Sequence, residues 1–530
     1  MSRVMQSPTP LFRALEDGSE EPIDVADLFR YQRYRWLSGE SEKLATRYRK
    51  FNLQGLLDAS VKTVGIYGIS CIKLLKCVEG QFNKAFLLTM SNGFELIARL
   101  PNPNAGPAFY TTASEVASRH FLREKMSLPI PRIYSWSSEA SNPVGAEYIL
   151  EEKAPGQALG KIWDKLSLEA KLDMVNQVVD IEKKFASISI PKHGCIYYEA
   201  DLKSSPVRYE RLELNTSSKF GSFQDKQSPL FAIGPSASPV HWEREKAKMK
   251  LDRGPWENVA DYALALGMNE IEWATSTARP RMNFHRSMTS PEKPSDYIAL
   301  IEDYMALSPY LVSYPFTKLP NRISHPDLHL DNIFVDPDTN QITCIIDWQQ
   351  TCVSPVSLHR SHPQMLELSA ASQSRQGKHE SDLLDHHYTA IKESDPVRWK
   401  VLADPFHQVK SNPITMVPGC WDREDLFSLR AALITAVAHW NDMGHGGTPC
   451  PVSFGEEELS QHQDEMDLLE GISTVLHQLQ DDGLIPLGGM VRPGYYDRAM
   501  ELNNHFRREF IALAENEHQR ELHAKVWPYQ

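Results

Sequence analysis

Short apolar runs alternate with polar turns in the part of the chain from residue 66 to residue 152. Three of these runs fall near residues 73–79, 84–90 and 94–100. Asn92 and Gly93 lie between the last two runs, and an Asn-Gly pair in this position is typical of a tight β-hairpin. The pattern therefore predicts antiparallel strands in this region.

Helical spacing dominates as the chain continues. Residues 111–126, TTASEVASRHFLREKM, predict a helix, and residues 146–156, AEYILEEKAPG, predict a further strand that runs into a turn. Later segments with helical periodicity span residues 166–188, 256–275, 294–313, 423–440 and 456–482. A stretch near 200–256 is rich in Ser, Pro and Lys and predicts an irregular insertion. The pattern indicates an α+β chain with a small sheet-bearing lobe followed by a large helical one.

Residues 1–65 form an extension before the first predicted strand. Apolar residues at helical spacing predict short helices that pack against the rest of the protein. The sequence FRYQRYRW, residues 29–36, is more typical of a packed arm than of a strip on which nucleic-acid bases stack. The predicted divisions are 1–65, a partly helical extension, 66–152, a sheet-bearing N-terminal lobe, and 153–530, a helical C-terminal lobe.

Composition narrows the class of protein. The chain has 530 residues, of which 41% are hydrophobic and 24% charged, which is ordinary for a soluble globular protein with two or three substructures. The formal net charge of −13 argues against a nucleic-acid partner, which would need a basic face. No apolar run reaches the roughly 18 residues that a spanning helix requires, so no membrane span is expected.

Cysteine usage and the N-terminus bear on location. The seven cysteines are scattered and never form a C-x-x-C pair, which is typical of reduced intracellular thiols and argues against a disulfide framework or a zinc site. Four acidic residues lie between positions 16 and 21, where a mitochondrial targeting sequence is usually depleted of acids. Composition alone leaves the compartment open.

Acidic residues are concentrated in HPDLHLDNIFVDPDTNQITCIIDW, residues 325–348. NIFVD and ITCIID are β-rich runs separated by PDTNQ, so they predict a hairpin. The turn accounts for three polar residues: Asp336, Asp338 and Asn340. These three would also match the first ligands of a calcium loop, with Asp347 as its last. Gln341 stands where that loop requires glycine, and strands flank it, so the calcium interpretation is set aside.

Asp327, Asn332 and Asp347 flank the two predicted strands rather than the turn. Pairing of the strands brings Asn332, at the start of one, close to Asp347, at the end of the other. Oxygen ligands in this arrangement predict a site for a hard cation. The chain has His325 and Asp327, then Asn332 after four further residues, and then Asp347 after the hairpin. Enzymes of phosphoryl transfer use residues of these types in this order. There an Asp accepts a hydroxyl proton, and an Asn and a second Asp hold magnesium on the nucleotide phosphates.

HPDLHLDNIFVD and CIIDWQQ resemble the catalytic and metal-binding segments of the aminoglycoside phosphotransferase family, which shares the protein-kinase-like fold with choline kinases. FRYQRYRWL, EGQFNKAFLLTM, IARLP, SEVAS, EYILEEKAPG, FAIGPS and RGPW resemble the fungal group named for altered inheritance of mitochondria protein 9. The likeness covers about residues 25–510. It implies a two-lobed protein-kinase-like fold with a small β-rich N-lobe, and ATP and Mg²⁺ as cofactors.

The resemblance implies roles for the catalytic loop, residues 325–332, and for the hairpin that follows it. Asp327 would be the catalytic base, and His325 would hold the loop in place. Asn332 and Asp347 would be the magnesium ligands.

The resemblance also implies a nucleotide site in the N-lobe. Its residues would be Gly80, Phe82, Asn83, Arg99, Glu115, Glu151, Glu152 and Lys153. EGQFNK, residues 79–84, occupies the position of the nucleotide loop. Arg99 stands where kinases place the lysine that pairs with phosphate, and Glu115 would be its helix partner. Residues 151–154, EEKA, would form the hinge beside the adenine.

Three features depart from the family pattern. The nucleotide loop has one glycine where protein kinases have three. Arg99 replaces lysine, although the planar guanidinium group also binds phosphate. Pro326 stands where the family usually has a small residue.

Several charged features also have a purely structural interpretation. Arg99 with Glu115, taken alone, is more typical of a surface ion pair, and only the order of the pair relative to Asp327 and Asp347 favours a site instead. The acid-rich run at residues 456–470 would suit a cationic substrate, but a solvated helix face is the expected interpretation. The basic run REKAKMK, residues 244–250, is likewise expected to be solvated.

The leading functional hypothesis is ATP- and magnesium-dependent transfer of a phosphoryl group to a hydroxyl of a small molecule. The alternative is a kinase-like nucleotide-binding regulatory or scaffold protein with little or no turnover. The presence of Asp327, Asn332 and Asp347 together favours the enzyme. The identity of the acceptor is not encoded in a readable motif. The resemblance implies a mitochondrial location, with the cytoplasm as the alternative.

Overall fold

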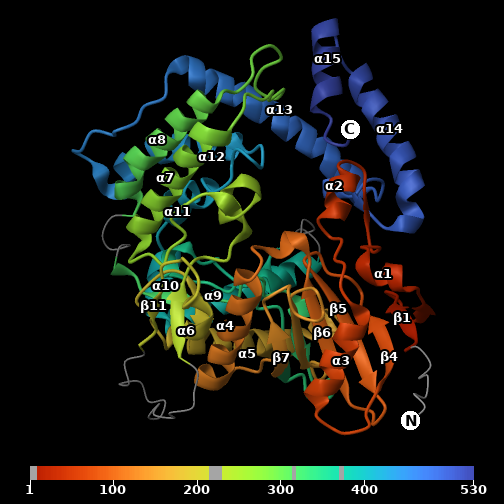
Figure 1. Ribbon diagram of the computed structural model, residues 1–530. Helices are drawn as coiled ribbons and strands as arrows, with labels where there is room; N and C mark the ends of the chain where they lie inside the picture. The colour runs from red at the N-terminus through yellow and green to blue at the C-terminus, as the bar shows by residue number, and fades with distance from the viewer. Residues whose placement is uncertain (1–8, 214–229, 313–317, 369–374) are drawn as a thin grey trace.

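One seven-stranded sheet contains the strands predicted in the N-terminal lobe. The computed structural model describes residues 9–213, 230–312, 318–368 and 375–530. The strand order is β2-β1-β4-β5-β6-β8-β7 (Figure 1). In that order the strands span Glu20–Pro22, Leu11–Ala14, Cys71–Lys76, Asn83–Met90, Glu95–Pro101, Tyr148–Glu152 and Ile133–Ser137. The three strands predicted between residues 73 and 100 and the strand predicted within 146–156 are confirmed.

Alternating burial explains why these runs form strands with one covered face. In β5 the side chains of Phe86, Leu88 and Met90 are buried and project to the same face, because strand residues two apart point the same way. Helix α3 (Leu53–Val64) packs its apolar residues into the same cluster. Gly93 in the β5–β6 turn has a φ of 85°, as a tight Asn-Gly turn requires, so the predicted hairpin is confirmed.

The extension contributes two strands that the sequence pattern did not predict. β1 pairs in parallel with β4, and β2 pairs antiparallel with β1, so residues 11–22 widen the sheet at its edge. Both strands are too short to show an alternation, so the expectation of a partly helical extension did not include them. The helical part of the expectation corresponds to α1 (Val25–Phe29), α2 (Glu40–Ala45) and α3. Residues 1–8 of the extension lie outside the described residues.

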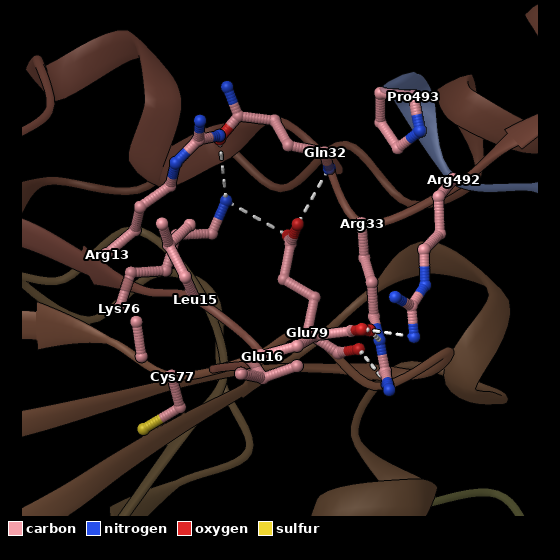
Figure 2. Close-up of a pocket in the computed structure, with 12 residues that line it drawn as sticks. Arg13, Leu15, Glu16, Gln32, Arg33, Lys76, Cys77, Glu79, Arg492 and Pro493 are labelled. Carbon is pink, nitrogen blue, oxygen red and sulfur yellow. Dashed lines mark hydrogen bonds and ion pairs between the residues drawn. The ribbon is translucent and has the colours of Figure 1, made fainter. Parts of the chain in front are cut away.

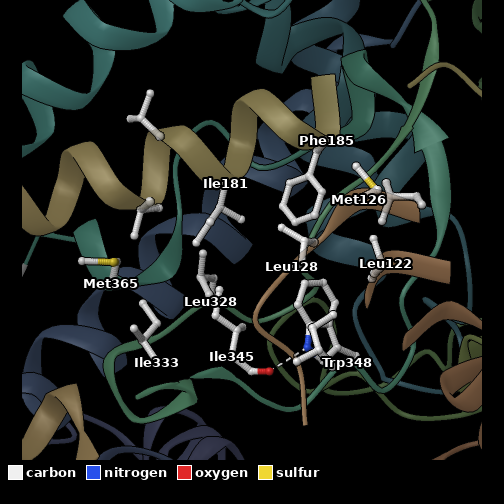
Figure 3. Packing of buried hydrophobic residues seen from close by; sticks show 14 of the residues in the cluster. Leu122, Met126, Leu128, Ile181, Phe185, Leu328, Ile333, Ile345, Trp348 and Met365 are labelled. Atoms are coloured by element: carbon white, nitrogen blue, oxygen red, sulfur yellow. Dashed lines mark hydrogen bonds between the residues drawn. The ribbon is translucent and has the colours of Figure 1, made fainter. Parts of the chain in front are cut away.

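Helix α4 (Tyr110–Met126) confirms the predicted helix and contributes to a core that serves both lobes. Its apolar face packs into one buried cluster with α5 (Leu168–Ala186) and with the segment that carries the catalytic motif. In Figure 3, Trp348 lies in this cluster near Phe185 of α5, with 6.2 Å between the ring centroids. The indole nitrogen of Trp348 donates to the carbonyl of Ile345 at 2.9 Å. The apolar core therefore packs against the segment that carries the predicted catalytic motif.

The predicted helical segments of the C-terminal lobe are present. The longer helices in its described part are α5, α7 (Val259–Thr277), α8 (Pro294–Leu311), α9 (Arg375–Ser394), α12 (Leu426–Ala438), α13 (Glu456–Asp481) and α14 (Tyr496–Ala512). The shorter ones include α6 (Glu199–Leu202), α10 (Pro396–Leu402), α11 (His407–Met416) and α15 (Glu517–Val526). Helices α7, α8, α11 and α12 share a core that is separate from the one behind the catalytic motif. The observed architecture is an α+β fold with two lobes, as the sequence predicts.

Two small sheets position the C-lobe motifs. The predicted hairpin is confirmed: β14 (Ile333–Val335) pairs antiparallel with β15 (Ile342–Ile345), and β9 (Gln157–Ala158) pairs with β14. Within the stretch predicted to be irregular, β12 (Phe231–Gly234) is a buried strand between β10 (Cys195–Tyr198) and β11 (Glu210–Arg211). The irregular prediction was therefore wrong for β12, which burial against β10 stabilises. Residues 214–229 of the predicted insertion lie outside the described residues.

The charged runs expected to be solvated are only partly so. Within the acidic run at 456–470, Glu465 is buried and its carboxylate lies 3.2 Å from Arg286 and 3.3 Å from Arg430. Within the basic run, Lys246 is buried and its ammonium group lies 2.7 Å from a carboxylate of α7. These expectations were wrong for Glu465 and Lys246, because their partners lie far away in the sequence.

Residues 35–37 of the extension meet the C-terminal segment beside the N-lobe. β3 (Arg35–Trp36) pairs antiparallel with β17 (Met490–Val491), and β13 (Asn321–Ile323) pairs with β16 (Val353–Pro355) deeper in the C-lobe. Leu37 of the extension packs in one buried cluster with residues of α14 and of the C-terminal segment, including Trp527. In Figure 1 the blue helices α14 and α15 accordingly stand beside the red helix α2.

We expect Gly156→Ala to lower the free energy of unfolding by about 3 kcal/mol or more, from left-handed strain added to overpacking. Gly156 has a φ of 87°, and a Cβ there would clash with the carbonyl oxygen of Val335 in β14. Gly145, with a φ of 72° and nothing within 4 Å of a Cβ, is the matched control, and Gly145→Ala is expected to lose about 1 kcal/mol. Equal losses in denaturant titrations would contradict this account.

Candidate active site

His325 fixes the catalytic loop to the segment that follows β15. Its Nε2 lies 2.9 Å from the carbonyl oxygen of Ile346, and its Nδ1 accepts the backbone N–H of Asp327 at 3.1 Å. The ring packs edge-on against Trp348, with centroids 4.4 Å apart. Both hydrogen bonds are made by a neutral ring that carries its proton on Nε2. Burial lowers the pKa of His325 to about 4, so the ring stays neutral at physiological pH.

Asp327 and Asn332 are joined through the loop backbone. The amide nitrogen of Asn332 donates to the carbonyl oxygen of Asp327 at 2.9 Å, and the side chain of Asn332 is buried. This leaves the amide oxygen of Asn332 as the atom suited to a metal. The carboxylate of Asp327 is 47% exposed, and its Oδ2 lies 3.8 Å from Nε2 of His329. The side chain of Asp327 is therefore exposed, while its backbone holds the loop.

Asp347 lies beside Asn332 because the backbone N–H of Ile346 donates to the carbonyl of Asn332 at 3.0 Å. Its φ of 63° is unusual for a residue other than glycine and is a form of strain found at functional sites. The side chain is 39% exposed, yet its Oδ1 is buried and has no hydrogen-bond partner. Burial raises the pKa of Asp347, and the nearby charge of Arg99 opposes that shift. A buried carboxylate oxygen that makes no hydrogen bond, on the residue after one bonded to the backbone of Asn332, fits an oxygen ligand of a hard dication.

Arg99 connects Asp347 to the N-lobe. Its guanidinium group makes a bidentate pair with Glu115 of α4, at 2.7 and 3.1 Å, and lies 3.9 Å from Glu151 and 3.7 Å from Asp347. Burial alone would lower the pKa of Arg99, but the surrounding carboxylates, Glu115 foremost, outweigh it and hold the pKa above its ordinary value. The side chains of Arg99 and Glu115 are 12% and 2% exposed, so the surface ion pair interpretation is wrong.

Arg119 is a member of this network that the sequence analysis missed. It lies one helical turn after Glu115, 3.4 Å from its carboxylate, and it also forms an ion pair with Glu151. The spacing of four residues between Glu115 and Arg119 was the available signal. Its second partner, on β8, had no local signal.

The predicted hinge residues direct their side chains to other protein groups. Glu151 belongs to the network around Arg99, and the carboxylate of Glu152 accepts the backbone N–H of Arg132 at 3.0 Å. The ammonium group of Lys153 lies 2.7 Å from Glu95. A contact of this stretch with adenine would therefore come from its backbone, and the predicted role remains a prediction.

The predicted nucleotide loop contacts the metal-binding segment. The side-chain amide of Asn83 donates to Gln349, two residues after Asp347, at 2.8 Å. Gly80 is exposed, a Cβ added there would meet nothing within 4 Å, and Phe82 is also exposed. The contact between Asn83 and Gln349 brings the loop next to Asp347, and Gln349 is a further residue that the motif analysis missed.

The fold and these contacts define a class. A β-rich lobe with a buried Arg–Glu pair faces a helical lobe in which H-x-D, Asn and Asp converge on one hairpin, and this is the architecture of a kinase-like phosphotransferase. A sequence profile described as the phosphotransferase enzyme family matches residues 74–358. The chain belongs to this family, which confirms the resemblance to aminoglycoside phosphotransferases.

Fungal relatives share most of the chain. A subtelomeric hrmA-associated cluster protein of Aspergillus fumigatus is 30% identical, over 87% of this chain and 97% of its own length. Altered inheritance of mitochondria protein 9 of Kluyveromyces lactis, named as mitochondrial, is 22% identical over 88% of this chain and 87% of its own. The predicted likeness to this second group is confirmed.

Solved structures of low identity resemble the chain. A ternary complex of streptomycin, ATP and APH(2")-IIa is 13% identical, with a TM-score of 0.38, and covers 74% of this chain and 98% of its own. An ethanolamine kinase of Plasmodium vivax is 12% identical, with a TM-score of 0.37, and covers 77% and 92%. Within the described residues, no helix is long and apolar enough to cross a bilayer.

We expect His325 to titrate near pH 4 instead of its ordinary 6.5. The unfolded chain then binds more protons between these two values, so the contribution of His325 to stability is complete above pH 6.5 and is lost as the pH falls towards 4. NMR of protein labelled at histidine, with the signal assigned by its absence in His325→Gln, measures this. A signal that titrates near 6.5 would contradict the buried, neutral ring.

Proposed function

We propose that the protein transfers the γ-phosphoryl group of Mg–ATP to a hydroxyl group of a small molecule. The observation that carries this proposal is the convergence of an exposed carboxylate, Asp327, with a pair of oxygen ligands, Asn332 and Asp347, on one hairpin. Arg99 places a positive charge 3.7 Å from the second ligand. Base, metal ligands and phosphate-binding charge are the parts that phosphoryl transfer requires.

Each side chain has a defined task in this proposal. Asp327 accepts the proton of the acceptor hydroxyl, and its exposed carboxylate is free to do so, since the loop is held by its backbone and by His325. Asn332 and Asp347 would hold a magnesium ion, which would neutralise charge on the nucleotide phosphates. Arg99, already fixed by Glu115, offers its remaining N–H groups to phosphate oxygens without reorganising.

The acceptor and the compartment complete the proposal. The acceptor is proposed to be a small molecule that bears a hydroxyl group, without a specific identity, because the chain belongs to the phosphotransferase enzyme family. The mitochondrial names of the fungal relatives support a mitochondrial location. A screen of a metabolite library with purified protein and Mg–ATP, with mass detection of phosphorylated products, identifies the acceptor.

We expect Asp347→Ala to abolish magnesium-dependent nucleotide binding, because it removes the carboxylate whose buried oxygen makes no hydrogen bond. Titration calorimetry of ATP with and without Mg²⁺ measures this. Asp338→Ala, an exposed position in the turn of the same hairpin, is the control and should bind as the wild type does. Retention of magnesium-dependent binding by Asp347→Ala would remove the metal assignment.

Asp327→Asn keeps the shape of the side chain and removes the proton acceptor. We expect turnover to fall by about 10²- to 10⁴-fold, with the nucleotide dissociation constant unchanged within a few-fold. Asp331→Asn makes the same change in the same loop, where the side chain has no proposed chemical role, and should turn over normally. The alternative of a scaffold protein predicts no product from the wild type with any acceptor, and complementation of a deletion strain by Asp327→Asn.

A further inference from the structure

Glu79, the first residue of the nucleotide loop, is a buried carboxylate between two buried lysines. Its side chain is 5% exposed, and those of Lys76 and Lys84 are 2% and 0% exposed. Its Oε1 lies 3.0 Å from the ammonium nitrogen of Lys76 and 3.1 Å from that of Lys84. Figure 2 shows the carboxylate of Glu79 directed between Lys76 and the backbone of Gln32. One carboxylate cannot neutralise two ammonium groups, so further acceptors are required.

The extension supplies those acceptors. Lys76 donates to the carbonyl oxygens of Asp27 and Arg30, both at 2.8 Å, and Lys84 donates to the carbonyl of Arg30 at 2.9 Å. The backbone N–H of Gln32 donates to Glu79 Oε2 at 2.7 Å. The backbone of residues 27–32 therefore provides the remaining hydrogen-bond partners of Lys76, Glu79 and Lys84.

Two further contacts bind the loop to the same segment. Arg33 donates from Nη1 to the carbonyl oxygen of Glu79 at 2.9 Å. Arg47 donates from Nε and Nη2 to the side-chain oxygen of Gln81, at 3.1 and 2.9 Å, and Gln81 donates to the hydroxyl of Tyr31 at 3.3 Å. The guanidinium group of Arg47 also stacks over Trp36, 4.6 Å from the ring centroid. Residues 27–47, called the strap below, thus hold the loop on both sides of Gly80.

The strap accounts for a departure from the family pattern. A loop with three glycines adapts to phosphate through a mobile backbone, whereas this loop has one glycine, flanked by two residues whose side chains are held. Burial lowers the pKa of Lys84 to about 8, and the charge of Glu79 opposes that shift. Side-chain contacts therefore fix the loop where glycines would leave it free.

We propose that the strap, residues 27–47, is a positioning element that holds the nucleotide loop in its binding conformation through Glu79 and Gln81. The proposal rests on the proposed function, because it gives the extension a role in nucleotide binding. Gln81 and Glu79 are positioning residues here, and they act on the loop and not on the reacting atoms. The loop is then ordered when the protein folds, so binding does not have to order it. This pre-organisation raises nucleotide affinity.

The test compares Gln81→Ala with Lys73→Ala. Lys73 forms an ion pair with Glu20, so it also joins β4 to the extension, but at a half-exposed position that does not contact the loop. We expect Gln81→Ala to raise the apparent dissociation constant of Mg–ATP by about 3- to 10-fold, as it would if the binding-competent fraction falls to about 10–30%. The same change should appear in KM for ATP, with kcat nearly unchanged. Lys73→Ala should leave both values as in the wild type.

Hydrogen exchange separates this proposal from the proposed function. Without nucleotide, the amides of residues 80–83 should exchange faster in Gln81→Ala and Arg47→Ala than in the wild type or Lys73→Ala, after correction for intrinsic rates. If the wild type binds no ATP, the proposed function fails while the exchange experiment still tests the strap. Unchanged exchange and unchanged affinity in both Gln81→Ala and Arg47→Ala would overturn the proposal that the strap positions the loop. Glu79→Gln is expected to show the larger exchange effect, with thermal melting as its check on folding.

Discussion

The buried positive charge of Arg99 is the constraint on which the arrangement of the two lobes depends. A guanidinium group removed from water must be surrounded by carboxylates, and these come from α4, from β8 and from the segment after β15. Glu115 alone provides both hydrogen bonds of a planar fork. Removing one partner of such a buried set typically costs about 3–5 kcal/mol, because the remaining charge stays uncompensated. Helix α4, strand β8 and Asp347 are therefore fixed relative to one another.

The apolar core extends this constraint to the catalytic loop. Trp348 directly follows Asp347, is fully buried, and provides the surface on which the ring of His325 packs. His325 in turn binds the backbone on either side of the site, at Asp327 and at Ile346. Asp347 thus makes the charged contact with Arg99, and the next residue, Trp348, makes the apolar contact with His325. The carboxylate of Asp327 remains exposed while everything behind it is packed.

The features predicted correctly have local signals. The strands between residues 73 and 100 follow from alternation and an Asn-Gly turn, and α4 follows from helical spacing. The hairpin that places Asn332 close to Asp347 follows from two apolar runs and a turn sequence. Its proposed chemistry follows from the order of polar residues. In these segments the neighbours in sequence are also the neighbours in space.

The features missed depend on distant partners. β1 is a strand because it pairs with β4, and β2 because it pairs with β1. Their own few residues show no alternation of apolar and polar side chains. Glu465 and Lys246 are buried because of partners on other helices, and Glu151 turns away from the hinge because Arg99 and Arg119 attract it. The contact of Asn83 with Gln349 spans 266 residues. No motif encodes such a pairing, because it exists only once the chain is folded.

The contact between the N-terminal part of the chain and the segment at residues 490–491 has a consequence for biosynthesis. Gln81 also contacts Met490, 409 residues further along the chain, next to the short strand that pairs with the extension. At a translation rate of about 5–20 residues per second, that separation corresponds to about 20–80 s between the synthesis of the two residues. During that interval β3 has been made and β17 has not, so the two strands cannot yet pair. The contact of Gln81 with Met490, beside the predicted nucleotide loop, is therefore added to the fold only after most of the chain has been made.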